Sequence, residues 1–204
     1  MIAIITGDLI ASAKKPTSYW MPVLKNTLSE FGKTPRDWEI YRGDAFQLEI
    51  KEASTALITA IHLKAMLKMN EGLDARMSIG LGEKKFTARR ITQSNGSAFV
   101  NAGQRFDTLK PEKVNLAIET GNERLNQELN LIIKLALVFM DNWSPTSAKL
   151  VNICLKQPGI IQSDIAGLLN INQSAVSQQK KRAQFDLVED LNTYFTMRIK
   201  EYAP

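Results

Sequence analysis

The 204-residue sequence contains one cysteine and one histidine, and this scarcity excludes several kinds of site. Cys154 has no second thiol with which to form an internal disulfide or a cysteine zinc site. A single histidine, His62, and a single cysteine do not supply a Ser-His-Asp or a Cys-His catalytic set. We therefore expect Cys154 to be a packing residue and His62 to lie in or beside the core.

Long apolar runs and glycine-rich phosphate loops are also missing. No apolar run approaches the roughly 18 residues that a membrane span needs. The N-terminal MIAIITGDLI is short, reaches Asp8 and lacks the basic start of a signal peptide. Gly80, Gly82 and Gly96 are scattered and form neither a P-loop nor a dinucleotide fingerprint. We expect a cytoplasmic protein with no membrane partner.

The charge balance is only mildly basic. Lys and Arg number 26 against 21 Asp and Glu, a formal net charge of +5. Residues 141–204 hold 7 of the basic and 6 of the acidic side chains, which leaves +4 on the rest. A polyanion bound by the C-terminal part would therefore contact a local basic cluster, not a basic domain.

The pattern of the first 120 residues predicts alternating strands and helices. Strands are expected over 1–6, 38–42, 45–51, 74–83 and 114–119, and helices over 16–32, 53–70 and 97–109. Gly43-Asp44 between the second and third strands indicates a hairpin. The order βαββαβ is typical of ferredoxin-like palm domains.

The remaining sequence is predicted to be helical. Residues 123–140 are an apolar connector helix, and Ser144-Pro145 opens a further domain with proline at a first helical turn. We predict an α+β chain with a palm domain over 1–120, a connector over 121–143 and an all-α helix-turn-helix domain over 144–204.

The segment QSDIAGLLNINQSAVSQQKKRA, residues 162–183, has the helix-turn-helix pattern. One helix is expected over 162–169 and the recognition helix from about 173 to 183, with Asn170-Ile171-Asn172 as the turn. Small and apolar residues would hold the two helices together, and polar ones would face DNA bases and phosphates. The predicted DNA-binding residues are Gln173, Ser174, Ser177, Gln178, Lys180, Lys181 and Arg182. The alternative is a helical module for protein contact, with the basic run as a solvated face.

Two acids mark a predicted metal site. Asp8 ends the first strand and Asp44 lies in the hairpin turn. Strands one and three are neighbours in a βαββαβ sheet, so both carboxylates should reach one edge. Oxygen ligands of this kind suit Mg²⁺ or Mn²⁺ with nucleotide phosphates. The alternative is that both acids cap backbone amides in turns.

A polar pair on the next helix extends this pattern. Asn101 and Arg105 are four residues apart, so they share one helix face. With Asp8 in ITGDLI and Asp44 in RGDAF, this stretch resembles the class III nucleotidyl cyclases over about residues 1–110. The resemblance implies metal binding by Asp8 and Asp44. It implies catalytic roles for Asn101, orienting the ribose, and Arg105, stabilising the transition state across a dimer.

The base-reading lysine of adenylyl cyclases falls on Ile40, and this departure favours a divergent or inactive nucleotide-binding palm. Over nearly its full length the chain resembles the SatD family. The resemblance rests on the runs MIAIITGD, WEIYRGDAFQLEI, RMSIGLGE, SNGSAFVN and QSAVSQ. That family implies little about activity.

Three functions follow from these patterns. The first is a homodimeric DNA-binding regulator whose cyclase-like domain binds a nucleotide of unknown identity. The alternative is a metal-dependent nucleotidyl cyclase or transferase with an accessory helical domain. The third is a protein-interaction adaptor that has neither activity.

Overall fold

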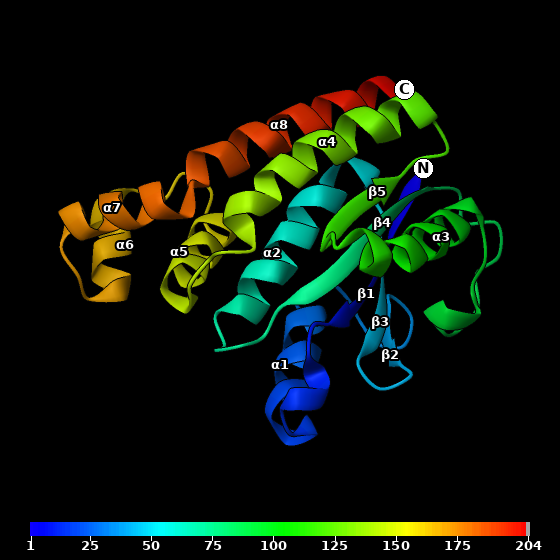
Figure 1. Ribbon diagram of the computed structural model, residues 1–204, viewed down its shortest axis with the longest axis horizontal. Helices are drawn as coiled ribbons and strands as arrows, with labels where there is room; N and C mark the ends of the chain where they lie inside the picture. Colours follow the sequence, from blue (N-terminus) through cyan, green and yellow to red (C-terminus); the bar gives the residue numbers. More distant parts are fainter. Residues whose placement is uncertain (203–204) are drawn as a thin grey trace.

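The computed structural model describes residues 1–202 and is an α+β protein with one five-stranded sheet and eight α-helices (Figure 1). The strands are β1 Ile2–Leu9, β2 Trp38–Tyr41, β3 Ala45–Ile50, β4 Ala75–Gly82 and β5 Leu116–Glu119. The helices of the first part are α1 Thr17–Ser29, α2 Ala56–Lys68 and α3 Ser97–Glu112. The helices that follow are α4 Glu123–Met140, α5 Pro145–Lys156, α6 Gln162–Leu169, α7 Gln173–Ala183 and α8 Phe185–Tyr202.

The sheet has the strand order β2-β3-β1-β4-β5. Strand β1 pairs antiparallel with both β3 and β4, and β5 is added parallel to β4. The prediction that the first and third strands are neighbours is confirmed, with Gly7 opposite Phe46. This register brings the C-terminal end of β1 and the β2–β3 hairpin to the same edge of the sheet.

The two faces of the sheet are covered by different helices. Ala3, Ile5 and Leu9 of β1 belong to the large buried cluster that includes α2, whereas Ile4 packs with Ala98 and Ala102 of α3. This alternation is the two-residue period of a strand buried on both sides.

Helix α3 approaches β4 very closely at Gly80. A Cβ atom at this position would lie 2.1 Å from the backbone nitrogen of Ala102. The helix also runs three residues beyond its predicted end, through Pro111 to Glu112. Lys113 then adopts a left-handed φ of 55°, and its amide bonds back to the last turn.

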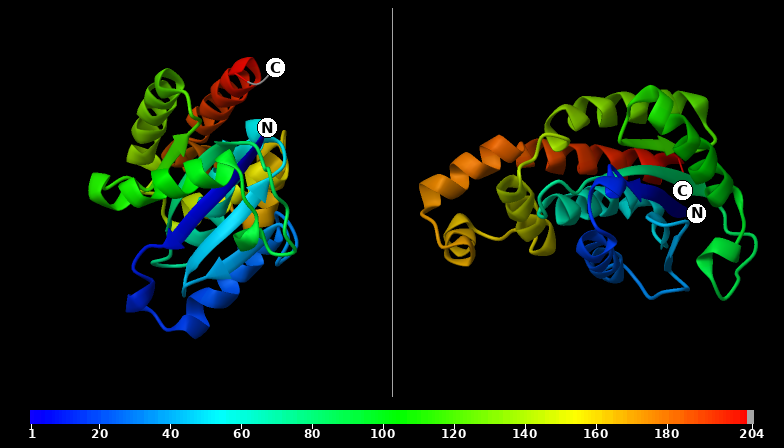
Figure 2. Two further views of the ribbon diagram at one scale, coloured as in Figure 1. Left: turned by 90° about the vertical axis from the view of Figure 1, so that its right-hand side faces the viewer. Right: turned by 60° about the horizontal axis from the view of Figure 1, so that its bottom comes forward.

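The buried residues continue without a break from the sheet into the C-terminal helices. One cluster contains Ala3 of β1, Leu57 of α2, Leu150 of α5 and Phe195 of α8. Figure 2 shows that these helices extend to one side of the sheet. Within residues 1–202, no helix combines the length and the apolar character of a membrane span.

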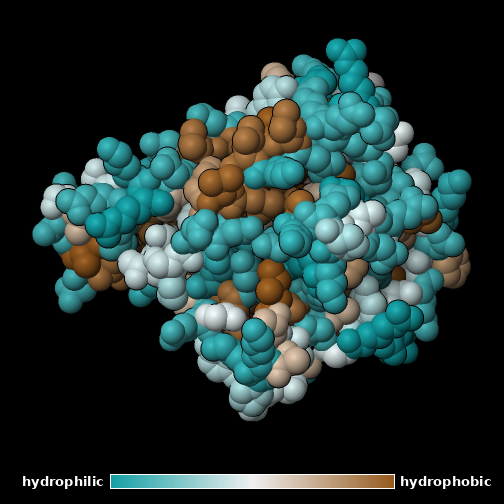
Figure 3. Space-filling model, in the orientation of Figure 1, coloured by the Kyte–Doolittle hydropathy of each residue, from teal (hydrophilic) through white to brown (hydrophobic). Residues whose placement is uncertain are grey.

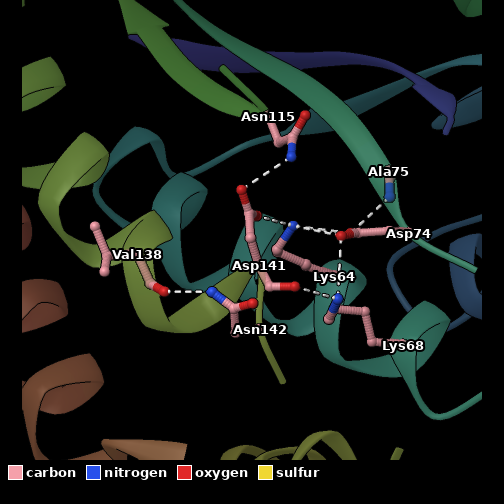
Figure 4. A network of polar contacts seen from close by, with 8 residues as sticks. All are labelled: Lys64, Lys68, Asp74, Ala75, Asn115, Val138, Asp141 and Asn142. Carbon is pink, nitrogen blue, oxygen red and sulfur yellow. Dashed lines mark hydrogen bonds and ion pairs between the residues drawn. The ribbon is translucent and has the colours of Figure 1, made fainter. Parts of the chain in front are cut away.

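A buried lysine joins three of these elements (Figure 4). The Lys64 side chain of α2 has no solvent exposure, and its Nζ lies 2.8 Å from Asp74 Oδ1 and 2.6 Å from Asp141 Oδ1. Lys68 Nζ donates to the backbone carbonyl of Asp141, and Asn115 Nδ2 donates to the Asp141 carboxylate. The turn after α4 is therefore fixed to α2 and to the start of β4.

The outer edge of β5 is bonded to a side chain. The amide of Asn130 on α4 accepts from the Ile118 nitrogen at 2.8 Å and donates to the Ile118 carbonyl at 2.9 Å. Asn130 thus supplies the donor and acceptor that a sixth strand would offer at this residue.

Candidate functional site

Helices α6 and α7 are found at the ranges that the sequence predicts. Asn170 ends α6 with a left-handed φ of 53°, and the Ile171 nitrogen bonds back to the Ala166 carbonyl at 3.0 Å. Asn172 then begins α7, its side chain accepting from the Ala175 nitrogen at 2.8 Å. These bonds satisfy backbone groups that the ends of both helices leave free, so the turn is fixed by its own sequence.

One side of α7 is anchored in the core and the other is open to solvent. Val176 and Ala183 are buried, and α7 packs on α5 and α6. At 3.6 residues per turn, five of the predicted DNA-binding residues lie within an arc of about 140° opposite this anchor. These exposed residues are Gln173, Ser174, Ser177, Gln178 and Lys181; we call them the α7 polar stripe.

The other two predicted DNA-binding residues lie beside the stripe. Arg182 is exposed at its margin. Lys180 is partly buried, with Nζ 5.2 Å from the centre of the Phe185 ring and 3.9 Å from the Asp186 carboxylate. Lys180 therefore faces the start of α8 rather than the stripe.

Asp8 forms an ion pair that the sequence did not indicate. Both of its carboxylate oxygens accept from Arg76 directly across the β1–β4 ladder, at 3.2 and 2.5 Å. Tyr41 lies close by: burial raises the pKa of its hydroxyl, Arg42 lowers it, and the charges of Asp107 and Asp8 raise it again. Asp8 thus belongs to a polar cluster formed by β1, β2, β4 and α3.

Asp44 lies in the turn between β2 and β3, two residues before Phe46, which pairs with Gly7. Asp8 and Asp44 therefore occupy the same end of the β1–β3 ladder. Two carboxylates would supply only part of the coordination shell of a divalent cation, so phosphate and water oxygens would have to complete it. In residues 1–202, no three or more His, Cys, Asp or Glu side chains are grouped so that they could hold a metal ion.

Asn101 and Arg105 both lie on α3, and each already has partners within the chain. Asn101 Nδ2 donates to the Leu81 carbonyl of β4 at 2.7 Å. Arg105 makes two bonds of 2.8 Å to the Glu112 carboxylate and one to Thr108. Arg105 faces a pocket between α3 and α4, with Lys134 on its far wall. For either side chain to contact a nucleotide, it would have to exchange these partners.

The chain matches no protein-family model, no curated protein and no solved structure. The resemblances to the SatD family and to the cyclases thus depend on the sequence motifs quoted above.

Proposed function

We propose that this protein is a homodimeric DNA-binding regulator with a cyclase-like domain that binds a nucleotide. The observation that carries the DNA half is the α7 polar stripe, which stands on a helix held by buried Val176 and capped by Asn172. Such a helix, presented next to a tight turn, is how a helix-turn-helix domain enters the major groove. A palindromic operator requires two copies of the chain.

The stripe divides by chemistry along α7. Gln173, Ser174, Ser177 and Gln178 offer hydrogen bonds to base edges, for which a good bidentate pair gives about 1–3 kcal/mol of discrimination. Lys181, and Arg182 at the margin of the stripe, follow towards the C-terminal end of α7 and would contact phosphates. With about two phosphate contacts per protomer, the logarithm of affinity should fall with the logarithm of salt with a slope near −2 per protomer.

The nucleotide would bind at the edge of the sheet that carries Asp8 and Asp44. The strand order β2-β3-β1-β4 supports a ferredoxin-like βαββαβ palm, to which β5 would add one strand. Asp8 and Asp44 at one end of the β1–β3 ladder would hold Mg²⁺ or Mn²⁺ beneath the phosphates. Arg76, which now neutralises Asp8, would turn to the phosphates when the cation takes its place.

DNA binding is tested by fluorescence anisotropy of labelled mixed-sequence duplex DNA in low salt. We expect Gln173→Ala combined with Lys181→Ala to raise the Kd about tenfold or more, equivalent to about 1.4 kcal/mol. Lys134→Ala, which removes an exposed lysine from α4, should change the Kd by less than about twofold. A wild-type protein that shows no salt-sensitive binding would overturn the DNA half.

The second candidate function is a metal-dependent nucleotidyl cyclase or transferase, and the shared edge position of Asp8 and Asp44 favours it. The protein is incubated with each of the four triphosphates and Mn²⁺, and products are separated chromatographically. Cyclic or oligomeric product that disappears in Asp44→Asn but persists in Asp186→Asn would establish the enzyme. A blank for all four nucleotides would reject it. An adaptor role is left if neither DNA nor nucleotide binds.

A further inference from the structure

An apolar surface covers the outer sides of α4 and α8, which run alongside each other (Figures 1 and 3). Of the thirteen exposed large hydrophobic residues in the described chain, seven lie on these two helices. They are Leu131, Leu135, Val138, Leu187, Tyr194, Met197 and Tyr202. This concentration is unlike the single exposed apolar residues that are normal on protein surfaces. We call it the α4/α8 face.

The exposed residues follow helical spacing. Leu131, Leu135 and Val138 are separated by four and three residues, so they line one side of α4. The opposite side of α4 is also apolar, because Leu129 and Ile133 are buried in the core. A helix that is apolar on both sides has a second surface to cover besides the core.

A groove of about 550 Å³ lies between the two helices. Its walls include Leu135, Val138 and Phe139 from α4 and Leu187 and Leu191 from α8. Among the described residues that line it, only Asp190 is charged, so the groove is predominantly apolar and suits an apolar side chain. At one end of the groove the Glu128 carboxylate of α4 links the two helices by accepting hydrogen bonds from Tyr194 and Arg198 of α8.

We propose that the α4/α8 face binds the same face of a second copy of this chain. The inference rests on the proposed function for its need of two copies. The face presents both ridges, Leu135 and Val138, and a groove beside them, which is what a two-fold, self-complementary interface requires. Two adjacent helices of 18 residues give a flat area of about 27 by 20 Å, near 540 Å² before side-chain relief is counted.

That area is close to what a stable dimer needs. A standard interface buries roughly 600–1,000 Å² per partner, with an apolar centre and a polar rim. The α4/α8 face divides in a similar way along its length, since Leu135, Val138 and Leu187 lie towards its α7 end while Arg124 and Lys200 are exposed towards the other end.

The interface would fix the two α7 helices relative to each other. Only Gln184 separates α7 from α8, and Trp143 Nε1 donates to the Ala183 carbonyl at 2.9 Å across this junction. An α8 helix held in a dimer therefore holds its α7 helix as well. The second copy thus sets the spacing of the two half-sites on DNA.

The test is the mass of the full chain in solution, measured by light scattering after size exclusion over a range of concentrations. We expect wild type at twice the chain mass of 22.9 kDa. Leu135→Glu combined with Val138→Glu should give monomer and weaken self-association at least about 100-fold, since each charge would be buried without a partner. Far-UV circular dichroism must show that this variant remains folded.

Leu168→Glu is the matched control, because Leu168 is an equally exposed leucine, 56% against 62% for Leu135, on α6 outside this face. It should stay dimeric. A wild-type monomer at every concentration, or a control that dissociates as fully as the α4/α8 variant, would overturn the proposal. A dimer that binds no DNA would reject the DNA function and leave this interface standing.

Discussion

The buried side chain of Lys64 connects α2 to two other parts of the chain. Its ammonium group is fully enclosed and compensated by two carboxylates from elements far apart in sequence, Asp74 and Asp141. A buried charge is tolerated only when its partners are in place, and removing one partner leaves the others uncompensated. The sequence alone does not indicate this buried group, because its partners Asp74 and Asp141 lie on other parts of the chain.

Lys64→Met is expected to lower the free energy of unfolding by about 3 kcal/mol. The value lies at the low end for a buried pair, because the Asp74 and Asp141 side chains keep 17% and 31% exposure and recover some solvation. Urea denaturation provides the measurement. Lys156→Met, which removes a surface pair with Glu30, should cost less than about 1 kcal/mol. Equal losses in the two variants would contradict this account.

His62 should make the free energy of unfolding depend on pH near 6.5, and the sequence holds no second histidine that would titrate there. Burial lowers the pKa of His62 below its ordinary 6.5, the contact with Asn152 opposes this, Lys156 lowers it further and Glu30 raises it. The folded protein therefore favours neutral imidazole, while the unfolded chain binds more protons. Stability from this group is full above pH 6.5 and is lost as the pH falls below that value.

The urea concentration at the unfolding midpoint should accordingly decrease as the pH is lowered from about 7.5 to about 5.5. His62→Gln, which retains a hydrogen-bonding group opposite Asn152, should remove most of the change because the sequence holds no other histidine. Carboxylates with lowered pKa, such as Asp37 at about 2, titrate below this interval. An unchanged pH dependence in the variant would show that other groups are responsible.

The contact between α3 and β4 depends on the absence of one side chain. Gly80→Ala would place a Cβ against the backbone of Ala98 and Ala102, which cannot rotate away as a side chain could. We expect a loss of about 3 kcal/mol in the free energy of unfolding, from overpacking. Gly103 lies on α3, and a Cβ added there would meet no atom within 4 Å. Gly103→Ala should therefore stabilise the fold by about 0.5–1 kcal/mol. Thermal denaturation distinguishes the two signs.

Helices and strands were predicted well where local sequence determines them. The ranges of α4, α6 and α7 follow from apolar spacing and from turn and capping residues such as Asn170 and Asn172. Pairings across the chain were not predictable in this way. The Asp8–Arg76 ion pair joins residues 68 positions apart and depends on the β1–β4 register. Sequence motifs indicated Asp8 but not the cation that already neutralises it.

For the candidate catalytic pair, too, the position on a helix was predictable but the contacts were not. A four-residue spacing on a helix correctly placed Asn101 and Arg105 together on α3. Spacing carries no information on which neighbours those side chains meet after folding. Their bonds to the Leu81 carbonyl and to Glu112 depend on how α3 lies on the sheet and where α3 ends.

The continuous core predicts that the sheet and the C-terminal helices unfold together. Trp20 and Trp38 report on the sheet, whereas Trp143 lies between α4 and α5, and all three are buried. In a Trp20→Phe, Trp38→Phe variant, Trp143 fluorescence should therefore change at the same urea concentration as the far-UV circular dichroism. In a Trp143→Phe variant, the fluorescence of Trp20 and Trp38 should likewise change at the same urea concentration as the far-UV circular dichroism. Separate midpoints within either variant would show two independently folding units.

The Asn130 amide on the β5 edge has a consequence for assembly. An open strand edge is a template on which another chain can add a strand, and this route leads to indefinite fibres. At Ile118 that template is already occupied by a side chain from the same molecule. Extension of the sheet past β5 would first have to break both bonds of Asn130. Growth of the sheet by strand addition is therefore obstructed at the β5 edge.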